Sequence, residues 1–210
     1  VREDTRRIHV SLESLAGLPE DWLSARTVVD GQVELTTEYP VYFPVQTYCA
    51  DAAVREQLYR EFTARGYPEN KPVLEKLLTL RHEYASTLGF ESWADYSAQD
   101  KMVGSASAIS AFIDSLELIA RPRMDADLAE LLAAKQKDYP DATEFHAWDR
   151  FYYQRLVKEE RCGLDTKAVR SFFPYKSVLD GVLTLMSGLF GVEFRASDAP
   201  VWHPSIRPYD

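Results

Sequence analysis

Cysteine is scarce in this sequence, and long apolar runs are absent. Cys49 and Cys162 are the only cysteines among 210 residues, and one pair does not build a disulfide framework. We interpret both as small, buried or half-buried residues. No apolar run approaches the roughly 20 residues that a membrane-spanning helix needs, and no signal-peptide pattern occurs. These absences favour a reducing, cytoplasmic setting and no membrane partner.

Positive charge is also in deficit. The 24 Lys and Arg residues are outnumbered by 33 Asp and Glu residues, which gives a formal net charge of −9. Attraction to phosphate backbones and anionic lipids is therefore disfavoured, and nucleic acid is not an expected partner. Apolar residues make up 46% and charged residues 27% of the sequence. This composition is typical of a folded domain, or of a compact piece of a larger one.

The chain contains none of the short motifs that most directly reveal enzyme chemistry. Its four histidines are His9, His82, His146 and His203. No two of them lie three or four residues apart, the spacing with which a helix directs two imidazoles at one zinc ion. No H-E-x-x-H, glycine-rich phosphate loop or G-x-S-x-G elbow occurs either. On this basis we assign no catalytic and no metal-binding residue, and we expect no cofactor in this chain.

Two histidines come close to a functional pattern. His82 and Glu83 begin like a metalloprotease helix, but Ser86 occupies the position of the second histidine, so we interpret His82 as a helical surface residue. His146 precedes Asp149, and a carboxylate that orients an imidazole raises its basicity. A metal-independent hydrolase built on this pair is one hypothesis. The alternative, a capping or packing role for His146, is the more common one.

Aromatic side chains are concentrated between Trp148 and Tyr153. Trp148, Phe151 and Tyr152 recur at helical spacing, which predicts that they face inward, whereas Tyr153 is expected to point elsewhere. A second interpretation is a ligand-binding wall, because tyrosine offers a hydroxyl from an apolar ring. Core packing is the favoured interpretation. Trp202 is likewise expected to be a buried anchor.

Apolar periodicity predicts a mostly α-helical fold with about seven to nine helices and only minor short strands. Asp51 and Ser105 are the predicted N-caps of two helices, and Gly89 is a predicted stop. Pro122 is expected to end or kink the helix that starts after Ser105, which gives two packed helices or one bent helix. The expected helical segments are 18–23, 51–66, 72–88, 105–140, 148–162, 165–172, the last with Asp165 as its cap, and 174–191.

Two further predictions concern burial and extended structure. One side of the segment 72–88 should be buried, with the residues Leu74, Leu77, Leu78 and Tyr84. Residues 32–39 alternate with a period near two, which predicts a strand. The strip that Pro40 and Pro44 bracket is expected to be extended but outside any central strand. The other strand-like stretches are 192–194 and 201–209.

Six blocks in one consistent order carry a resemblance to a known family. AWDRFYY at Ala147–Tyr153 resembles an Ala-Trp-Asp-x-x-Tyr-Tyr signature, and Val201–His203 matches a Val-Trp-His step. The six blocks are 39–66, 80–96, 112–122, 147–153, 172–194 and 201–203. Together they make the chain similar to the thimet oligopeptidase family of zinc metallopeptidases, which includes neurolysin, oligopeptidase A and peptidyl-dipeptidase.

The resemblance implies a site that this chain does not contain. Family members bind zinc through an H-E-x-x-H helix and a third ligand further on, and all of these positions would lie beyond Asp210. No catalytic or metal-binding residue of the family therefore maps onto this sequence, and its substrate-binding residues are unassigned. By resemblance, residues 1–210 are a single helical segment from the middle of a larger peptidase, upstream of the zinc-binding helix. Zinc is expected in the full-length enzyme only.

The function that the resemblance implies is that of a fragment of a cytoplasmic zinc metallopeptidase that hydrolyses short oligopeptides. The segment would form channel wall and framework and be inactive alone. The alternative is a non-catalytic helical module that binds peptides or serves as a scaffold. A segment separated from a larger enzyme should also expose apolar surface, which favours self-association.

Overall fold

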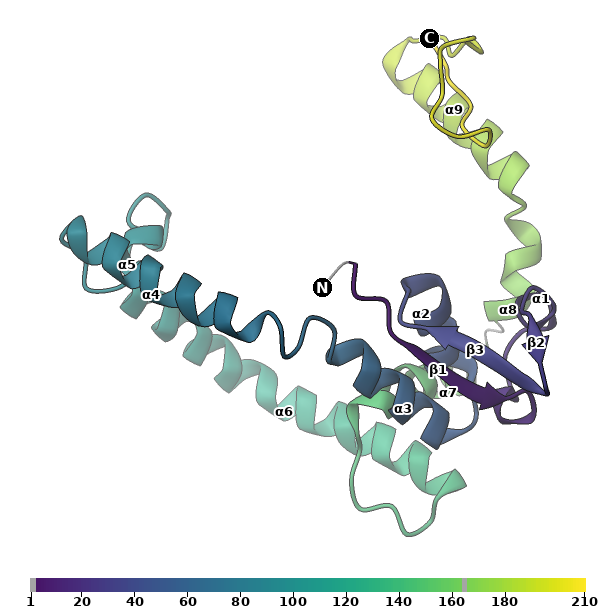
Figure 1. Cartoon of the computed structure of the whole chain (residues 1–210), viewed down its shortest axis with the longest axis horizontal. Coiled ribbons are helices and arrows are strands. Elements are labelled where there is room, and N and C mark those ends of the chain that lie inside the picture. The colour runs from purple at the N-terminus through teal and green to yellow at the C-terminus, as the bar shows by residue number, and fades with distance from the viewer. Residues whose placement is uncertain (1–2, 164–165) are drawn as a thin grey trace. The chain divides into compact units, whose positions relative to one another are not determined.

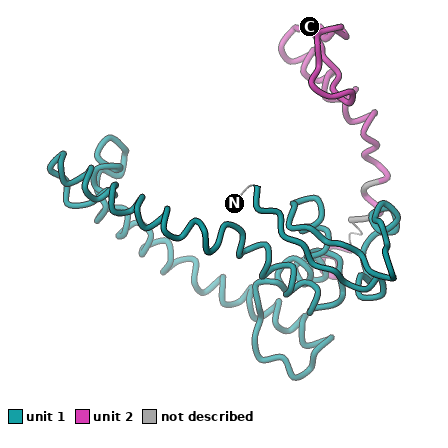
Figure 2. The backbone as a smooth tube through the Cα atoms, viewed as in Figure 1, with its two compact units in different colours: residues 1–158 teal, residues 159–210 magenta. Residues whose placement is uncertain are grey.

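The computed structural model describes residues 3–163 and 166–210. The described residues are mostly helical, with helices α1 to α9 and one small sheet (Figure 1), which confirms the predicted fold class. The chain divides into two compact units, residues 1–158 and 159–210 (Figure 2). Among the described residues, none of the helices combines the length and apolar character that a bilayer span requires.

Three short antiparallel strands form the sheet, in the order β1-β3-β2. They are β1 (Arg7–Ser11), β2 (Val28–Val29) and β3 (Gln32–Thr36). Ile8 pairs with Leu35 and Val10 pairs with Val33, and all four are buried because alternate residues of a strand point to the same face. The predicted strand at 32–39 is thus confirmed over its first five residues, and β1 is an addition to the prediction.

The strip that Pro40 and Pro44 bracket is a helix, α2 (Tyr39–Tyr48), so the prediction of an extended segment is wrong. Pro40 lies in the first turn, where its missing N–H has no helical partner to lose. Pro44 lies inside the helix and cannot donate to the carbonyl of Pro40 four residues earlier. That carbonyl accepts a hydrogen bond from the Trp22 indole N–H at 3.3 Å. A tertiary contact thus offsets the bond that the helix lacks.

Helix α3 (Ala52–Thr63) begins where the sequence predicts. The Asp51 carboxylate accepts hydrogen bonds from the N–H groups of Ala53 and Val54 at 2.8 and 3.4 Å, as an N-cap does. Helices α2 and α3 pack with the sheet, the 3-10 turn η1 (Glu13–Leu15) and the short α1 (Glu20–Ser24). The apolar core between them contains Ile8, Val10, Leu15, Leu18, Val33, Leu35, Val41, Tyr42, Val45, Cys49, Val54 and Leu58.

Three helices follow, namely α4 (Lys71–Thr87), α5 (Trp93–Ala98) and α6 (Ala106–Asp138). Ser105 caps α6 as predicted, because its hydroxyl accepts a hydrogen bond from the N–H of Ala108 at 3.2 Å. Helix α6 continues through Pro122, which excludes the predicted alternative of two packed helices and agrees with the alternative of a single helix. A proline removes a single helical hydrogen bond, and the Leu, Ala, Glu and Lys residues on both sides are strong helix formers.

The side of α4 that we expected to be buried is exposed in this structure. Leu77 is 41% and Leu78 is 56% exposed, and Leu74 and Tyr84 are similarly open. Helix α6 also exposes a run of large apolar residues, namely Phe112, Ile113, Leu116, Leu118 and Ile119. The short α5 contacts α4 through the rings of Trp93 and Tyr96 against Tyr84. The periodicity identified an apolar face correctly, but no described element covers it.

A loop leads from α6 to the 3-10 turn η2 (Ala147–Asp149) and helix α7 (Arg150–Cys162). The second unit then contains α8 (Thr166–Val169), the turn η3 (Arg170–Phe172) and α9 (Tyr175–Phe190). Pro174 precedes α9, and Gly191 ends it in a left-handed conformation with φ of 64°, where glycine carries no Cβ penalty. The predicted cap Asp165 lies outside the described residues.

Two predictions for the last twenty residues are wrong. The strand-like stretches 192–194 and 201–209 form no regular strand in the described residues, apart from one isolated bridge between Ala196 and Tyr209. Trp202 is 86% exposed rather than a buried anchor. Both predictions relied on local apolar content, and the described part of this unit offers no layer against which those side chains pack.

Candidate functional site

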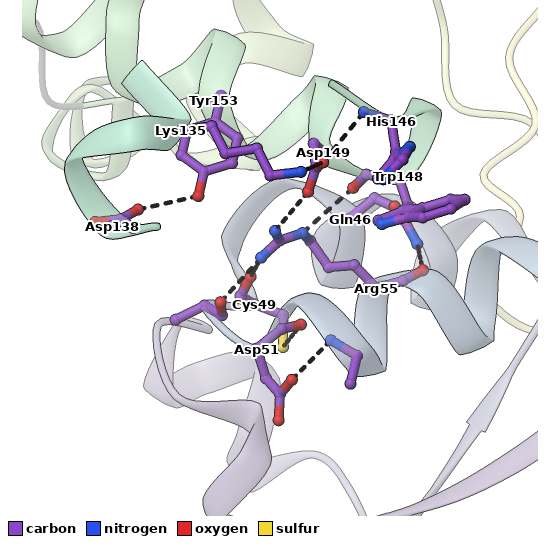
Figure 3. A network of polar contacts seen from close by, with 12 residues as sticks. Gln46, Cys49, Asp51, Arg55, Lys135, Asp138, His146, Trp148, Asp149 and Tyr153 are labelled. Carbon is purple, nitrogen blue, oxygen red and sulfur yellow. Dashed lines mark hydrogen bonds and ion pairs between the residues drawn. The ribbon is translucent and has the colours of Figure 1, made fainter. Parts of the chain in front are cut away.

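A fully buried arginine connects three parts of the first unit. The Arg55 guanidinium, which extends from α3, donates from Nε to the Trp148 carbonyl at 3.2 Å. Its Nη1 donates to the carbonyls of Cys49 and Ala50 at 2.8 and 3.0 Å (Figure 3). The guanidinium carbon lies 4.4 Å from the centroid of the Tyr152 ring. The planar fork of arginine suits such a set of simultaneous contacts.

Asp149, also fully buried, supplies the negative charge in this cluster. One carboxylate oxygen accepts from Arg55 Nη2 at 3.1 Å, and the other accepts from Lys135 Nζ at 2.7 Å. Lys135 also donates to the Glu144 carbonyl at 3.0 Å. Burial of a charge is costly unless the charge is paired and hydrogen-bonded, and these contacts meet that condition. Arg55, Lys135 and Asp149, which we call the charged joint, connect α3, α6 and η2.

The His146–Asp149 pair has the geometry of a helix cap. The backbone N–H of His146 donates to the Asp149 carboxylate at 3.2 Å, and the His146 side chain accepts from the backbone N–H of Asp149 in return. The imidazole stacks on the Trp148 indole with 4.5 Å between ring centroids. The capping alternative is therefore confirmed. The geometry gives no support to an acid–base pair, because the carboxylate serves two cations and a backbone N–H.

Tyr153 is the most deeply buried residue of the aromatic cluster, so the prediction that it points elsewhere is wrong. Its hydroxyl donates to the Asp138 carboxylate at 3.1 Å. Burial and this hydrogen bond both raise the pKa of the Tyr153 hydroxyl. The prediction for Tyr153 failed for a geometric reason. The cluster starts in a 3-10 turn, where three residues complete a turn instead of 3.6, and the α-helical spacing counted from Trp148 is out of phase.

A hollow of about 580 Å³ lies next to the charged joint, between α6 and the start of α7. Its α6 wall presents one helix face, because the lining residues there recur at intervals of three and four. The opposite wall comes from the loop and turn that precede α7. The residues that line it are Ala120, Arg123, Met124, Asp127, Leu128, Leu131, Phe145, His146, Ala147, Arg150 and Gln154.

The other histidines lie apart from this region along the chain. His82 is exposed on α4, as predicted, and His203 Nδ1 lies 2.8 Å from the Ser205 hydroxyl. His9 Nε2 lies 3.7 Å from a Glu34 carboxylate oxygen. Within the described ranges, no group of three or more His, Cys, Asp or Glu side chains is arranged to hold a metal ion.

The two cysteines are free and differ in exposure. Cys49 is buried as predicted, and its thiol donates to the Ser14 carbonyl at 3.2 Å. Burial raises the pKa of the Cys49 thiol, which lowers its reactivity because the thiolate is the nucleophile. Cys162 is exposed, so the prediction of burial is wrong for this residue.

Comparison with known proteins identifies the class to which this chain belongs. Oligopeptidase A of Salmonella typhimurium is 32% identical to it over an alignment that covers 93% of this chain and 31% of that protein. The thimet-like oligopeptidase of Dictyostelium discoideum is 25% identical and covers 100% and 33%. The organellar oligopeptidase A, chloroplastic/mitochondrial, of Arabidopsis thaliana is 28% identical and covers 87% and 24%. These relatives are peptidases by name.

Peptidase family M3 matches residues 45–210, and the chain belongs to this family. The resemblance inferred from the six sequence blocks is thereby confirmed. The chain spans about a quarter to a third of the length of the relatives it matches. All three residues of the charged joint lie within the matched range.

Two members of the charged joint were not found from the sequence. Arg55 stands three residues before Leu58 and seven before Phe62, on the same stripe of α3 as these apolar residues. A lone arginine on an apolar stripe is a signal of a buried pair, because burial of such a charge requires a partner. Lys135 offers the same signal less clearly, since basic residues near the end of a helix are common.

Proposed function

We propose that this chain is a framework segment of a longer zinc oligopeptidase that hydrolyses short peptides. The observation that carries the proposal is the match of residues 45–210 to peptidase family M3, together with 32% identity to an oligopeptidase A over most of the chain. The segment is a single helical piece upstream of the zinc-binding helix, and its setting is cytoplasmic. The scarcity of cysteine supports that setting.

The role of the segment is to form one wall of the peptide channel and to support the catalytic part. The charged joint supports this role, because its carboxylate fixes α3, α6 and η2 relative to one another without any contact suited to acid–base catalysis. The apolar faces of α4 and α6 also support it. Large apolar patches on a soluble protein are typical of surfaces that another part covers.

Zinc does not fit the residues of this chain, because the described side chains include no group that would ligate it. The ligands are therefore proposed to come from other parts of the longer polypeptide. A bound zinc ion in peptidases activates water, and no step of that chemistry is assigned to residues 1–210. The chain alone is expected to be inactive and to bind no stoichiometric zinc.

A chimera tests this proposal. The region of Salmonella oligopeptidase A that aligns with this chain is replaced by residues 1–210, and hydrolysis of a quenched fluorescent peptide is measured with and without a chelator. The proposal predicts chelator-sensitive hydrolysis by the chimera and none by the 210-residue chain alone. A chimera that is folded by circular dichroism, contains zinc and hydrolyses no peptide would contradict it, as would zinc-dependent hydrolysis by the chain alone.

The runner-up is a non-catalytic helical module that binds peptides. The hollow beside the charged joint favours it as a second candidate, because its volume of about 580 Å³ lies within the usual range of ligand sites. The chimera separates the two candidates. A scaffold or binding module would yield a folded chimera that binds the peptide and leaves it intact.

A further inference from the structure

The hollow between α6 and the start of α7 carries an uncompensated positive charge. Arg123 at its lining pairs with Asp127, whose carboxylate lies 2.8 Å from the guanidinium. The guanidinium carbon of Arg150 lies 5.4 Å from the centroid of the Phe151 ring. Within residues 3–163 and 166–210, no carboxylate lies within ion-pair distance of the Arg150 guanidinium. In a chain of net charge −9, such a cation is a site at which an anionic group gains attraction without displacing an internal partner.

The rest of the hollow is suited to apolar side chains in an extended arrangement. Met124, Leu128 and Leu131 lie on one face of α6, and Phe145 stands on the other wall. The α6 wall runs over the twelve residues from Ala120 to Leu131, and the eleven helical steps between them correspond to about 16 Å. An extended peptide advances about 3.3 Å per residue. The wall is therefore long enough for about five residues.

We infer that this hollow binds the C-terminal end of a short peptide, with the terminal carboxylate on the Arg150 guanidinium and apolar side chains against α6. The inference rests on the proposed function, since it names the part of the peptide that this segment holds. Every unmodified short peptide carries one terminal carboxylate whatever its sequence, and a guanidinium binds a carboxylate through two parallel hydrogen bonds. One free arginine beside an apolar wall thus accommodates many different peptides.

Calorimetric titration of the 210-residue chain tests the inference without any need for zinc or catalysis. The probes are Ac-Ala-Leu-Leu-Phe with a free carboxylate, the same peptide as its C-terminal amide, and Ac-Ala-Glu-Leu-Phe amide. The free acid should bind about tenfold or more tightly than its amide, the range expected of a charge-assisted hydrogen bond. The difference should shrink as salt is added, because exposed charges are screened.

Variants of both walls locate the binding. Arg150→Gln should remove the preference for the acid and leave the affinity of the amide unchanged, whereas Arg150→Lys should retain part of the preference. Leu128→Asp should weaken both peptides. Matched controls come from the other side of α6, where Arg121 and Leu118 line a separate hollow. Arg121→Gln and Leu118→Asp should leave both affinities unchanged, and circular dichroism verifies that each variant is folded.

Several results would overturn the inference. They are equal affinity for acid and amide, a preference that persists in Arg150→Gln, tight binding of the glutamate-containing amide, and no binding at all. Absence of binding would assign the hollow to another segment of the longer polypeptide. If the chimera hydrolyses peptides while titration fails, only the inference is lost. If titration succeeds while the folded, zinc-loaded chimera is inactive, the proposed function is lost and the binding site remains.

Discussion

The charged joint and the α4–α6 region both belong to the first unit, but they differ in how their side chains are partnered. In the charged joint, the polar groups of Arg55 and Asp149 are fully buried and find their partners within the chain. In α4 and α6, large apolar side chains such as Leu78 and Phe112 lie exposed. The first region is complete in itself, whereas the second has the composition of an interface. The difference indicates which part of the segment holds its own shape and which part needs a neighbour.

The largest expected effect comes from removal of the joint arginine. Arg55→Met leaves Asp149 with a single cation in a buried site, and loss of one partner of a buried pair costs about 3–5 kcal/mol. Urea unfolding measures the change. Arg60→Met is the matched control on the same helix, since Arg60 is 65% exposed in its ion pair with Glu56, and it should cost less than about 1 kcal/mol.

The triple variant Arg55→Met, Lys135→Met and Asp149→Leu sharpens this test. Replacement of a whole buried charged group by apolar residues is often close to neutral, so the triple variant should recover much of the stability lost in Arg55→Met. If Arg55→Met lowered the free energy of unfolding no more than Arg60→Met does, the charged joint would not be what stabilises the contact of α3, α6 and η2.

The next largest effect is expected at Gly17, where the turn after η1 meets the end of α2. Gly17 has φ of +96°, and a Cβ there would lie 2.3 Å from the Tyr48 carbonyl oxygen. Backbone strain of about 1–2 kcal/mol and overpacking of about 1–3 kcal/mol should add in Gly17→Ala. Gly31→Ala is the control, because φ is +75° but no atom lies within 4 Å of the added Cβ. If Gly17→Ala and Gly31→Ala unfolded at the same temperature, the close approach of the Tyr48 carbonyl to position 17 would be contradicted.

A pH effect on stability is expected from Tyr42, a buried residue of the apolar core. Burial raises the pKa of Tyr42 from 10.0 to about 12, so the folded state holds this proton more tightly than the unfolded state. The resulting stability is fully present below pH 10 and is lost between pH 10 and about 12, by at most about 2–3 kcal/mol. Tyr42→Phe should be nearly neutral at pH 7 and should reduce the slope of unfolding free energy in that window. If the pH dependence of the unfolding free energy were the same in Tyr42→Phe as in the parent chain, burial of the Tyr42 hydroxyl would not be its cause.

The smallest effect on stability is expected on the exposed faces. Leu78→Lys on α4 and Leu116→Lys on α6 should change the free energy of unfolding by about 0.5 kcal/mol or less, as surface substitutions do. They should instead reduce self-association of the chain, measured by sedimentation velocity. A chain that is already monomeric at high concentration, or a large loss of stability in either variant, would mean that these faces are not interfaces.

How much of this could be predicted from the sequence depends on whether the deciding contact is local. The caps at Asp51 and Ser105 act on N–H groups two or three residues away, and both were predicted correctly. The helix at Tyr39–Tyr48 was missed because the Trp22 contact that satisfies the Pro40 carbonyl comes from 18 residues earlier. The charged joint was missed for the same reason, since Arg55 and Asp149 are 94 positions apart.

The exposed faces show a different limit of the sequence. Periodicity predicted an apolar side on α4, and the structure places Leu74 and Leu77 on it together, but a pattern does not name the surface that covers it. The family was identifiable because six blocks retain their order. The site of chemistry was not identifiable from the sequence, because these 210 residues carry no short catalytic motif on which to base an assignment.

Hydrolysis of a quenched fluorescent peptide by the Salmonella oligopeptidase A chimera is the most direct test of the central claim that this chain is a framework segment of a zinc oligopeptidase. The account predicts chelator-sensitive cleavage by the chimera, a strong reduction of that cleavage in the chimera with Arg55→Met, and none by the 210-residue chain alone. A folded, zinc-loaded chimera that leaves the peptide intact would contradict the account.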